Sequence, residues 1–342
     1  MKSIAYLIPY FGRLPKGFDL WLISAGANPS IDWILFTDDH TGYNYPNNVK
    51  VVYQTYESFV GRIKEHFDFS ICIDRPWKLC EFRPAYGEIF SDELEGYDYW
   101  GHCDLDLLWG NIRSFITDDI LSRYEKIGFQ GHSTLYKNTP EVNGRYKTVV
   151  PDAGINYRDY FSSAEGHCFD EVGMCSIYDY LELPYYRETN FAHLDRFHSS
   201  FFLGHLPISE DYKNDRQVIV WDNGHVYRYY LTDGEVERDE FMYIHFFSRP
   251  IKYKNTTALP DHCYVARPDV IEDLCGPITA EYLSRYGKCP TILFYMRVAI
   301  ANRHKLTLRK IIQSFQIKAR NEKTRANSKV AVKASIEGND AK

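Results

Sequence analysis

The first third of the chain alternates short apolar runs with amphipathic segments. The apolar runs predict strands at residues 4–8, 31–36, 49–53 and 97–103, and the segments between them predict helices at 18–27, 56–67 and 76–90. Runs that are apolar throughout are typical of parallel strands, because helices cover both faces of such a sheet. The alternation therefore predicts an α/β fold with a doubly wound, Rossmann-like half over residues 1–110.

The rest of the chain has a more mixed pattern. It predicts a short helix at 112–120, strands at 126–130, 148–150 and 241–247, a loop at 138–144, and helices at 169–183, 268–286 and 290–316. Two alternating runs around Asn223-Gly224 predict a β-hairpin, because these residues suit a tight two-residue turn. We expect a main domain over 1–265, C-terminal basic helices over 266–320, and a disordered tail over 321–342, where aromatic residues are absent.

The amino-acid composition is unusual in its high content of aromatic residues. The 342 residues include 28 Tyr, 21 Phe and 6 Trp, and the aromatic fraction is 16%. Tyrosine offers a flat face with a hydroxyl group, which suits stacking on sugars and hydrogen bonding to them. An aromatic core explains the same composition, so both interpretations remain open at this point.

Charge is unevenly distributed along the chain. The formal net charge is −6, yet residues 285–333 hold 13 Lys and Arg against the single acidic residue Glu322. Such asymmetry indicates a segment that meets an anionic surface. Residues 306–317 also have an approximately helical apolar face, which suits an interfacial helix on anionic lipid or a helix docked on the core. A nucleic-acid partner is not expected, because no recognised nucleic-acid module accompanies the charge.

Cysteine usage and apolar run lengths indicate the compartment. The eight cysteines form no Cys-x-x-Cys pair and are scattered through apolar stretches, which is typical of free thiols in a reducing environment. The apolar run at the start is too short for a signal peptide and is broken by Pro9. No apolar run reaches the ~18 residues that a membrane span needs. We expect a cytoplasmic protein that is peripheral on the inner face of the membrane.

Two carboxylates follow the fourth predicted strand. Asp104 and Asp106 are one residue apart, so along an extended backbone their side chains point the same way. Carboxylates placed together repel each other unless a cation lies between them. Oxygen ligands suit a hard divalent ion such as Mg²⁺ or Mn²⁺, which often keeps open positions for substrate phosphates. The motif predicts a metal–diphosphate site, although a polar turn that happens to contain two Asp residues would look the same.

Four patches together resemble the glycosyltransferases of GT-A type. They are the strand-end turn Pro9-Tyr10-Phe11-Gly12, the second strand end at Thr37-Asp38-Asp39, the segment Lys78-Leu79-Cys80-Glu81-Phe82-Arg83, and the Asp104-Leu105-Asp106 motif. The likeness is strongest to bacterial members of polysaccharide and capsule biosynthesis that are similar to glycosyltransferase family 8, and it spans roughly residues 3–255. It implies a GT-A-like doubly wound mixed sheet with a C-terminal helical extension, and retaining transfer from a nucleotide-sugar, with UDP as the expected nucleotide.

The resemblance also implies roles for individual residues. Asp104 and Asp106 would bind Mn²⁺ or Mg²⁺, with His245 of the Tyr243–Pro250 segment as third ligand. The acidic pair Asp170-Glu171 and Asp152, which stands where the family has Asn, would face the reacting sugars. The nucleotide contacts would come from Tyr10, Phe11, Asp38, Asp39, Lys78, Arg83, Arg249 and Lys252. Arg249 or Lys252 would replace the basic residue of a late Lys-Pro-Trp motif that this chain lacks.

Each of these residues also has a plain structural explanation. Asp38 and Asp39 suit turns, Asp170 and Glu171 suit a helix N-terminus, and Asp152 suits a loop cap. Lys78 and Arg83 fit a solvated helix face. His245 fits a buried strand, and His102, His132 and His198 are interpreted as structural.

Two other functions remain open. A phosphatase of the haloacid-dehalogenase type also has a strand followed by Asp-x-Asp, but it expects a small residue where this chain has Leu108. A scaffold that binds glycan or lipid without turnover would have the same fold. The expected partners are a nucleotide-sugar donor, a glycan or lipid-linked saccharide acceptor, and the anionic membrane surface.

Overall fold

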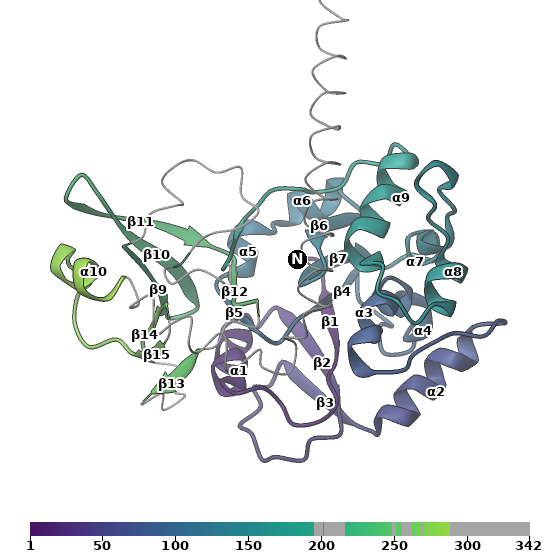
Figure 1. Ribbon diagram of the computed structural model, residues 1–342, viewed down its shortest axis with the longest axis horizontal. Helices are drawn as coiled ribbons and strands as arrows, with labels where there is room; N and C mark the ends of the chain where they lie inside the picture. Colours follow the sequence, from purple (N-terminus) through teal and green to yellow (C-terminus); the bar gives the residue numbers. More distant parts are fainter. Residues whose placement is uncertain (195–200, 202–215, 248–250, 255–261, 269, 288–342) are drawn as a thin grey trace, which may run out of the picture. The chain divides into compact units, whose positions relative to one another are not determined.

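The computed structural model describes residues 1–194, 201, 216–247, 251–254, 262–268 and 270–287 (Figure 1). Contacts divide the chain into the units Met1–Cys289 and Pro290–Lys342, and the described residues all belong to the first unit. The predicted helix at 290–316, the tail, His198 and Arg249 therefore lie outside the described residues.

The central sheet has six strands in the order β3-β2-β1-β4-β7-β6. Its strands are β1 (Ile4–Pro9), β2 (Ile31–Thr37), β3 (Val49–Tyr53), β4 (Tyr99–Cys103), β6 (Lys126–Gln130) and β7 (Ser133–Lys137). β1 is parallel to β2 and β4, and β2 is parallel to β3, whereas β7 runs antiparallel to both β4 and β6. The predicted mixed α/β sheet with a Rossmann-like parallel half is therefore confirmed.

Helices cover both faces of this sheet, as a doubly wound fold requires (Figure 1). On one face α1 (Phe18–Gly26) packs against the side chains of Tyr6 and Trp33, and on the other α2 (Tyr56–His66) packs against Leu7 and Phe36. Side chains alternate along a strand, so an apolar run supplies both cores at once. The second face is completed by α3 (Leu79–Phe82), α4 (Tyr86–Ile89), α7 (Pro140–Asn143), α8 (Tyr157–Ser162) and α9 (Met174–Tyr180).

A small sheet and a second six-stranded sheet follow. The small sheet has the order β5-β12-β8, formed by β5 (Leu107–Trp109), β12 (Tyr243–His245) and β8 (Phe191–His193). The second large sheet has the order β11-β10-β9-β14-β15-β13, formed by β9 (Gln217–Asp222), β10 (His225–Thr232), β11 (Glu235–Phe241), β13 (Lys252–Lys254), β14 (Tyr264–Arg267) and β15 (Val270–Asp273). α10 (Ala280–Tyr286) buries Leu283 against this sheet, and α5 (Ile112–Phe115) and α6 (Asp118–Arg123) follow β5.

Several predicted elements differ from the structure. The helix predicted at 76–90 is broken into α3, α4 and two 3₁₀ turns, Pro76–Lys78 and Arg83–Ala85, because Pro84 lacks a backbone N–H. The predicted loop at 138–144 contains α7, and the predicted strand at 148–150 is reduced to one bridge between Val150 and Ile155. The prediction of a helix over 268–286 is wrong in its first half, where β15 extends the sheet.

Other sequence-based expectations agree with the structure. The hairpin forms around Asn223 and Gly224, whose φ angles of 47° and 81° match the predicted tight turn. The seven cysteines in the described part of the chain are free. Within the described residues, every helix is too short or too polar to span a bilayer.

Candidate functional site

The two predicted metal-binding carboxylates lie at the junction between two sheets. β4 ends at Cys103, directly before Asp104, and β5 begins directly after Asp106. β5 pairs antiparallel with β12, and this register places Leu107 opposite His245. Phe246 also donates its backbone N–H to the carbonyl of Asp106 at 2.9 Å. The sheet pairing thus brings His245 to the Asp-x-Asp motif although about 140 residues separate them in the sequence.

The side chains of these three residues converge. The Nε2 atom of His245 lies 3.3 Å from Oδ1 of Asp106 and 3.8 Å from Oδ2 of Asp104. Their candidate ligand atoms all lie within 4.8 Å of one another. His245 is buried, and both carboxylates are about one-third exposed, so the site is open on the carboxylate side. Two carboxylate oxygens and one imidazole nitrogen fit a hard to borderline divalent ion such as Mn²⁺ or Mg²⁺.

Arg83 connects this cluster to the acidic pair at 170–171. Its Nη2 donates to Oδ1 of Asp104 at 2.5 Å, and its Nη1 donates to Oδ2 of Asp170 at 3.1 Å. Nη1 also donates to the carbonyl of Gly131 at 2.8 Å. Because these contacts are little exposed, Arg83 compensates the two acidic charges and fixes the distance between the carboxylates. Of the two basic residues predicted on this segment, Arg83 contacts the carboxylate cluster.

Asp170 and Glu171 lie on a π-helical turn, Phe169–Gly173, that begins at the site. Glu171 accepts the backbone N–H of Gly131 at 2.7 Å. Burial, together with the charges of Glu171 and Asp104, raises the pKa of Asp170 to about 7 against the opposing effect of Arg83. A carboxyl group of this kind can hold or release a proton near neutral pH, which suits a role in acid–base chemistry or in stabilising positive charge.

Glu81 holds this π-helical turn in place, a role that sequence reasoning did not find. Its Oε1 accepts the N–H groups of His167 and Cys168 at 2.7 and 2.9 Å, and its Oε2 accepts that of Phe169 at 3.2 Å. The carboxylate is buried, and it satisfies N–H groups at the start of the turn, including the buried one of Phe169. No local pattern in the sequence indicates this role, because Glu81 and the turn lie more than 80 residues apart in the chain.

Four of the predicted nucleotide contacts, Tyr10, Phe11, Asp38 and Asp39, lie at the carboxyl ends of β1 and β2. Asp38 accepts the N–H of Gly12 at 2.6 Å, and Asp39 accepts the N–H of Leu14 at 2.8 Å, so both hold the loop after β1. Phe11 packs on the aromatic rings of α2. Burial and then the charge of Asp106 raise the pKa of Tyr10.

Three other predicted residues have different surroundings. Lys78 is fully buried, and its ammonium group donates to the carbonyls of Tyr160 and Glu165 at 3.2 and 2.5 Å, so it holds the end of α8 and the chain after it. Asp152 is exposed on the turn Pro151–Ala153, and no hydrogen bond or ion pair among the described residues links it to the cluster. Lys252 is exposed at the start of β13.

Sequence reasoning also missed an aromatic residue and two histidines at the site. Burial and the charge of Asp106 raise the pKa of Tyr253, next to Lys252, to about 12. His132, interpreted from sequence as structural, and His193 lie beside His245, with ring centroids 4.2 and 4.8 Å from it. The neighbouring residues in the sequence do not indicate that His193 lies at the site, because only the pairing of β8 with β12 brings it next to His245.

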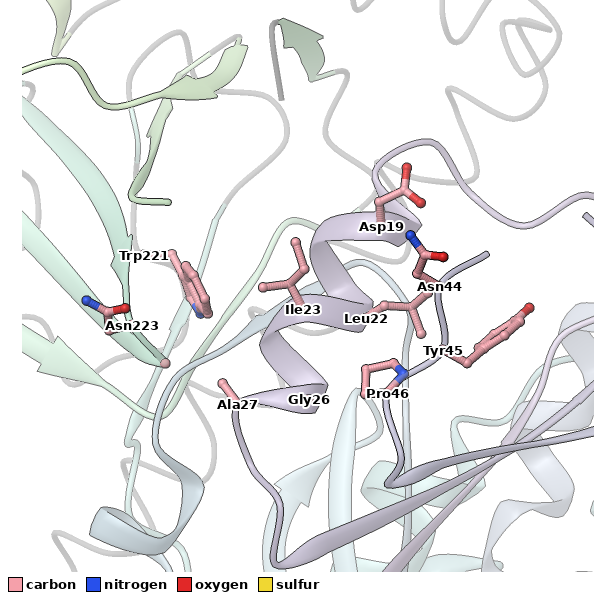
Figure 2. Close-up of a pocket in the computed structure, with 11 residues that line it drawn as sticks. Asp19, Leu22, Ile23, Gly26, Ala27, Asn44, Tyr45, Pro46, Trp221 and Asn223 are labelled. Atoms are coloured by element: carbon pink, nitrogen blue, oxygen red, sulfur yellow. The ribbon is translucent and has the colours of Figure 1, made fainter. Parts of the chain in front are cut away.

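A separate pocket of about 620 Å³ lies along α1 (Figure 2). Ile23 of the helix lies on the side toward Trp221 of β9, whereas Asp19 and Leu22 lie on the side toward the loop at 44–46. None of its lining residues is a predicted site residue.

Comparisons with known proteins give one family and several structures. The model of DUF6625, described as a family of unknown function, matches residues 6–274. Curated proteins give no sequence match. The structure is similar to the galactosyltransferase LgtC in complex with donor and acceptor sugar analogs, with 9% identity and a TM-score of 0.32 over 56% of this chain and 75% of that one.

Two further solved structures are similar at the same level. The glycosyltransferase GlyE of Streptococcus pneumoniae TIGR4 has 11% identity and a TM-score of 0.31, over 56% of this chain and 46% of that one. Mouse xyloside xylosyltransferase 1 in its apo form has 12% identity and a TM-score of 0.28, over 56% and 88% respectively.

Proposed function

The chain belongs to DUF6625, a family of unknown function, and we propose from the geometry of its site that it is a metal-dependent glycosyltransferase of GT-A type. The observation that carries the proposal is the convergence of Asp104, Asp106 and His245 within 4.8 Å. This convergence lies beside the carboxyl ends of parallel strands, where open α/β sheets bind their ligands. The donor in this proposal is a nucleotide-sugar, with UDP as the nucleotide.

The nucleoside end of the donor would bind over the loop after β1. Asp38 and Asp39 already hold that loop, so their role is to shape the site, while Tyr10 and Phe11 supply apolar surface. Arg249 or Lys252 would hold the diphosphate.

The acidic pair would face the sugar that is transferred. When bound, a divalent ion would neutralise the charge that develops on the leaving diphosphate. Asp170 or Glu171 would stabilise the positive charge that grows on the sugar ring in the transition state. Arg83 keeps Asp170 and Asp104 at a fixed separation, and it thereby orients the acidic pair relative to the ion. Asp152 stays a candidate for acceptor contact.

The acceptor in this proposal is a glycan or a lipid-linked saccharide of polysaccharide biosynthesis. The basic segment at 285–333 supports the lipid-linked form, because such an acceptor is presented at an anionic membrane surface. Retaining stereochemistry belongs to the same proposal through the resemblance to glycosyltransferase family 8.

The test is the thermal stability of the full chain with Mn²⁺ and a panel of nucleoside diphosphates and nucleotide-sugars. A ligand that binds only the folded protein stabilises it by about 2.7 kcal/mol at a hundred times its Kd, which raises the midpoint by roughly 4 °C for a protein of this size. We expect such a shift with one nucleotide, dependent on Mn²⁺ and absent in Asp106→Ala. Asp159→Ala, which removes an exposed carboxylate on α8, serves as the matched control and should keep the shift.

Sugar transfer is then measured with the nucleotide-sugar that binds. Asp106→Ala should abolish transfer and leave the circular dichroism spectrum unchanged. Transfer that persists in Asp106→Ala would contradict the proposal. Hydrolysis of a phosphomonoester without nucleotide binding would instead identify a phosphatase, and nucleotide binding without turnover would identify a scaffold.

A further inference from the structure

Three buried histidines form a second cluster next to the carboxylates. His132 lies in the turn between β6 and β7, His193 ends β8, and His245 ends β12. Their exposed fractions are only 3–5%, and their candidate ligand atoms all lie within 4.8 Å of one another. β8 and β12 pair in parallel with His193 directly opposite His245, so the sheet register itself places these two imidazoles side by side.

The contacts within the cluster define how the three imidazoles are oriented. Nδ1 of His245 lies 3.0 Å from Nδ1 of His193, whereas Nε2 of His245 points to the carboxylates. Nδ1 of His132 lies 3.0 Å from the hydroxyl group of Tyr243. A ligating histidine usually hydrogen-bonds through its other ring nitrogen in this way, which fixes its tautomer and orientation. For His132 the candidate ligand atom is therefore Nε2, since its Nδ1 contacts Tyr243. For His193 and His245 the candidates are the two Nδ1 atoms, because these already lie side by side.

The donor set separates this cluster from the carboxylate site. Three neutral imidazoles suit Zn²⁺ and related transition ions, whereas two carboxylates and water suit Mg²⁺ or Mn²⁺. Zinc–nitrogen bonds of about 2.0–2.1 Å require the nitrogens to be separated by roughly 3.4 Å, so small side-chain rotations within the present cluster are enough.

We propose that His132, His193 and His245 form a binding site for Zn²⁺ or a similar transition ion, and that this site competes with the carboxylate site for His245. A neutral imidazole has a lone pair on only one nitrogen. An ion on Nδ1 of His245 therefore leaves a proton on Nε2, and Nε2 then cannot bind an ion held by Asp104 and Asp106. Zn²⁺ in the histidine site removes one ligand from the Mn²⁺ site, so each ion weakens the binding of the other, as reciprocal coupling requires.

The experiment measures metal binding directly and uses no nucleotide or sugar, so it stands even if the proposed transfer activity fails. Zn²⁺ binding is followed by calorimetry, Co²⁺ binding by its visible absorption, and Mn²⁺ binding by the loss of the free-ion electron paramagnetic resonance signal. The double variant Asp104→Asn/Asp106→Asn should lose Mn²⁺ but keep one Zn²⁺, and should bind Co²⁺ with the intense absorption of four-coordinate geometry.

The histidine variants should show the opposite behaviour. His132→Ala and His193→Ala should lower Zn²⁺ affinity at least tenfold and keep Mn²⁺ binding, and His132→Asn and His193→Gln provide second variants if either alanine form does not fold. His225→Ala, which removes a half-buried histidine paired with Glu240 on the second sheet, is the matched control and should change neither ion. In the unsubstituted protein, saturating Zn²⁺ should reduce Mn²⁺ affinity.

Two results would overturn the proposal. One is a carboxylate double variant that is folded but binds no Zn²⁺ or Co²⁺. The other is a His193→Ala variant that loses Mn²⁺ affinity while its Zn²⁺ affinity stays unchanged, which would make His193 a positioning residue for the carboxylate site.

Discussion

Gly131 contacts both Arg83 and the acidic pair Asp170-Glu171. Its carbonyl accepts Arg83 and its N–H donates to Glu171. A Cβ atom built on Gly131 would lie 2.5 Å from Oδ2 of Asp170 and 2.9 Å from Cγ of Glu171, well inside van der Waals contact. Glycine is needed at this position because the side chains of Asp170 and Glu171 leave no space for a Cβ atom, and not because of an unusual backbone angle.

We therefore expect Gly131→Ala to push the acidic pair away from Arg83. Overpacking of this kind costs about 1–3 kcal/mol of unfolding free energy. The displaced carboxylates should also reduce sugar transfer by more than the stability loss explains, since transfer is measured well below the unfolding midpoint. Urea unfolding and transfer assays on the same preparation measure both effects.

The control for this variant is Gly61→Ala on α2, where an added Cβ meets no atom within 4 Å. Alanine is the better helix former, so this variant should be unchanged or up to about 1 kcal/mol more stable, with full activity. If Gly131→Ala behaves like Gly61→Ala, the close packing of the acidic pair on Gly131 does not matter for the site.

At the scale of elements, one buried carboxylate positions a functional turn. Glu81 on α3 accepts three backbone N–H groups at the start of the turn Phe169–Gly173, which carries Asp170 and Glu171. An amide in place of the carboxylate has one oxygen to accept and an NH₂ group that cannot. Glu81→Gln should leave at least one buried N–H without its acceptor, at a cost of about 1–3 kcal/mol.

The measurement is again urea unfolding, compared with Glu57→Gln in the exposed first turn of α2. Exposed substitutions away from special features change stability by about 0.5 kcal/mol or less. Equal stability of Glu81→Gln and Glu57→Gln would show that the turn holds its shape without the carboxylate.

The sequence predicted those strands and turns that are specified by residues next to one another in the chain. The apolar runs of β1 and β2 and the Asn223-Gly224 turn are examples, because burial on both faces and turn chemistry act within a few residues. The strand β11 was not predicted. Its sequence Glu-Val-Glu-Arg-Asp-Glu-Phe is acidic and partly exposed, and the strand is held by pairing with β10 through a second tight turn at Asp233 and Gly234.

The site was predictable to the same extent. Asp104 and Asp106 are visible because both lie in one short motif after an apolar strand. The contacts of His132, His193 and Glu81 arise from pairings between segments more than 50 residues apart, and no local periodicity encodes them. Lys78 was predicted either to contact phosphate or to lie on a solvated helix face, and neither alternative indicated that it would be buried and donate to two carbonyls.

At the scale of the whole molecule, the charge is divided between two parts of the chain. Residues 285–333 have a net charge of +12, and the rest of the chain is −18. Near an anionic bilayer, each Lys or Arg contributes about 1 kcal/mol of attraction, and salt screens this attraction. We expect the full chain to cosediment with vesicles that contain anionic phospholipid and to be released as salt is raised.

Arg309→Gln/Lys310→Gln tests whether the basic segment is responsible. Removing two charges should weaken vesicle binding by about 2 kcal/mol, which corresponds to roughly thirtyfold in the partition constant. Lys50→Gln/Lys64→Gln on the first unit removes the same charge elsewhere and serves as the matched control. If the basic segment is responsible, the control variant should bind anionic vesicles as the unsubstituted protein does. Neither of these two proteins should bind neutral phosphatidylcholine vesicles. Equal weakening in both double variants would mean that net charge alone, rather than the segment at 285–333, sets the affinity for the membrane.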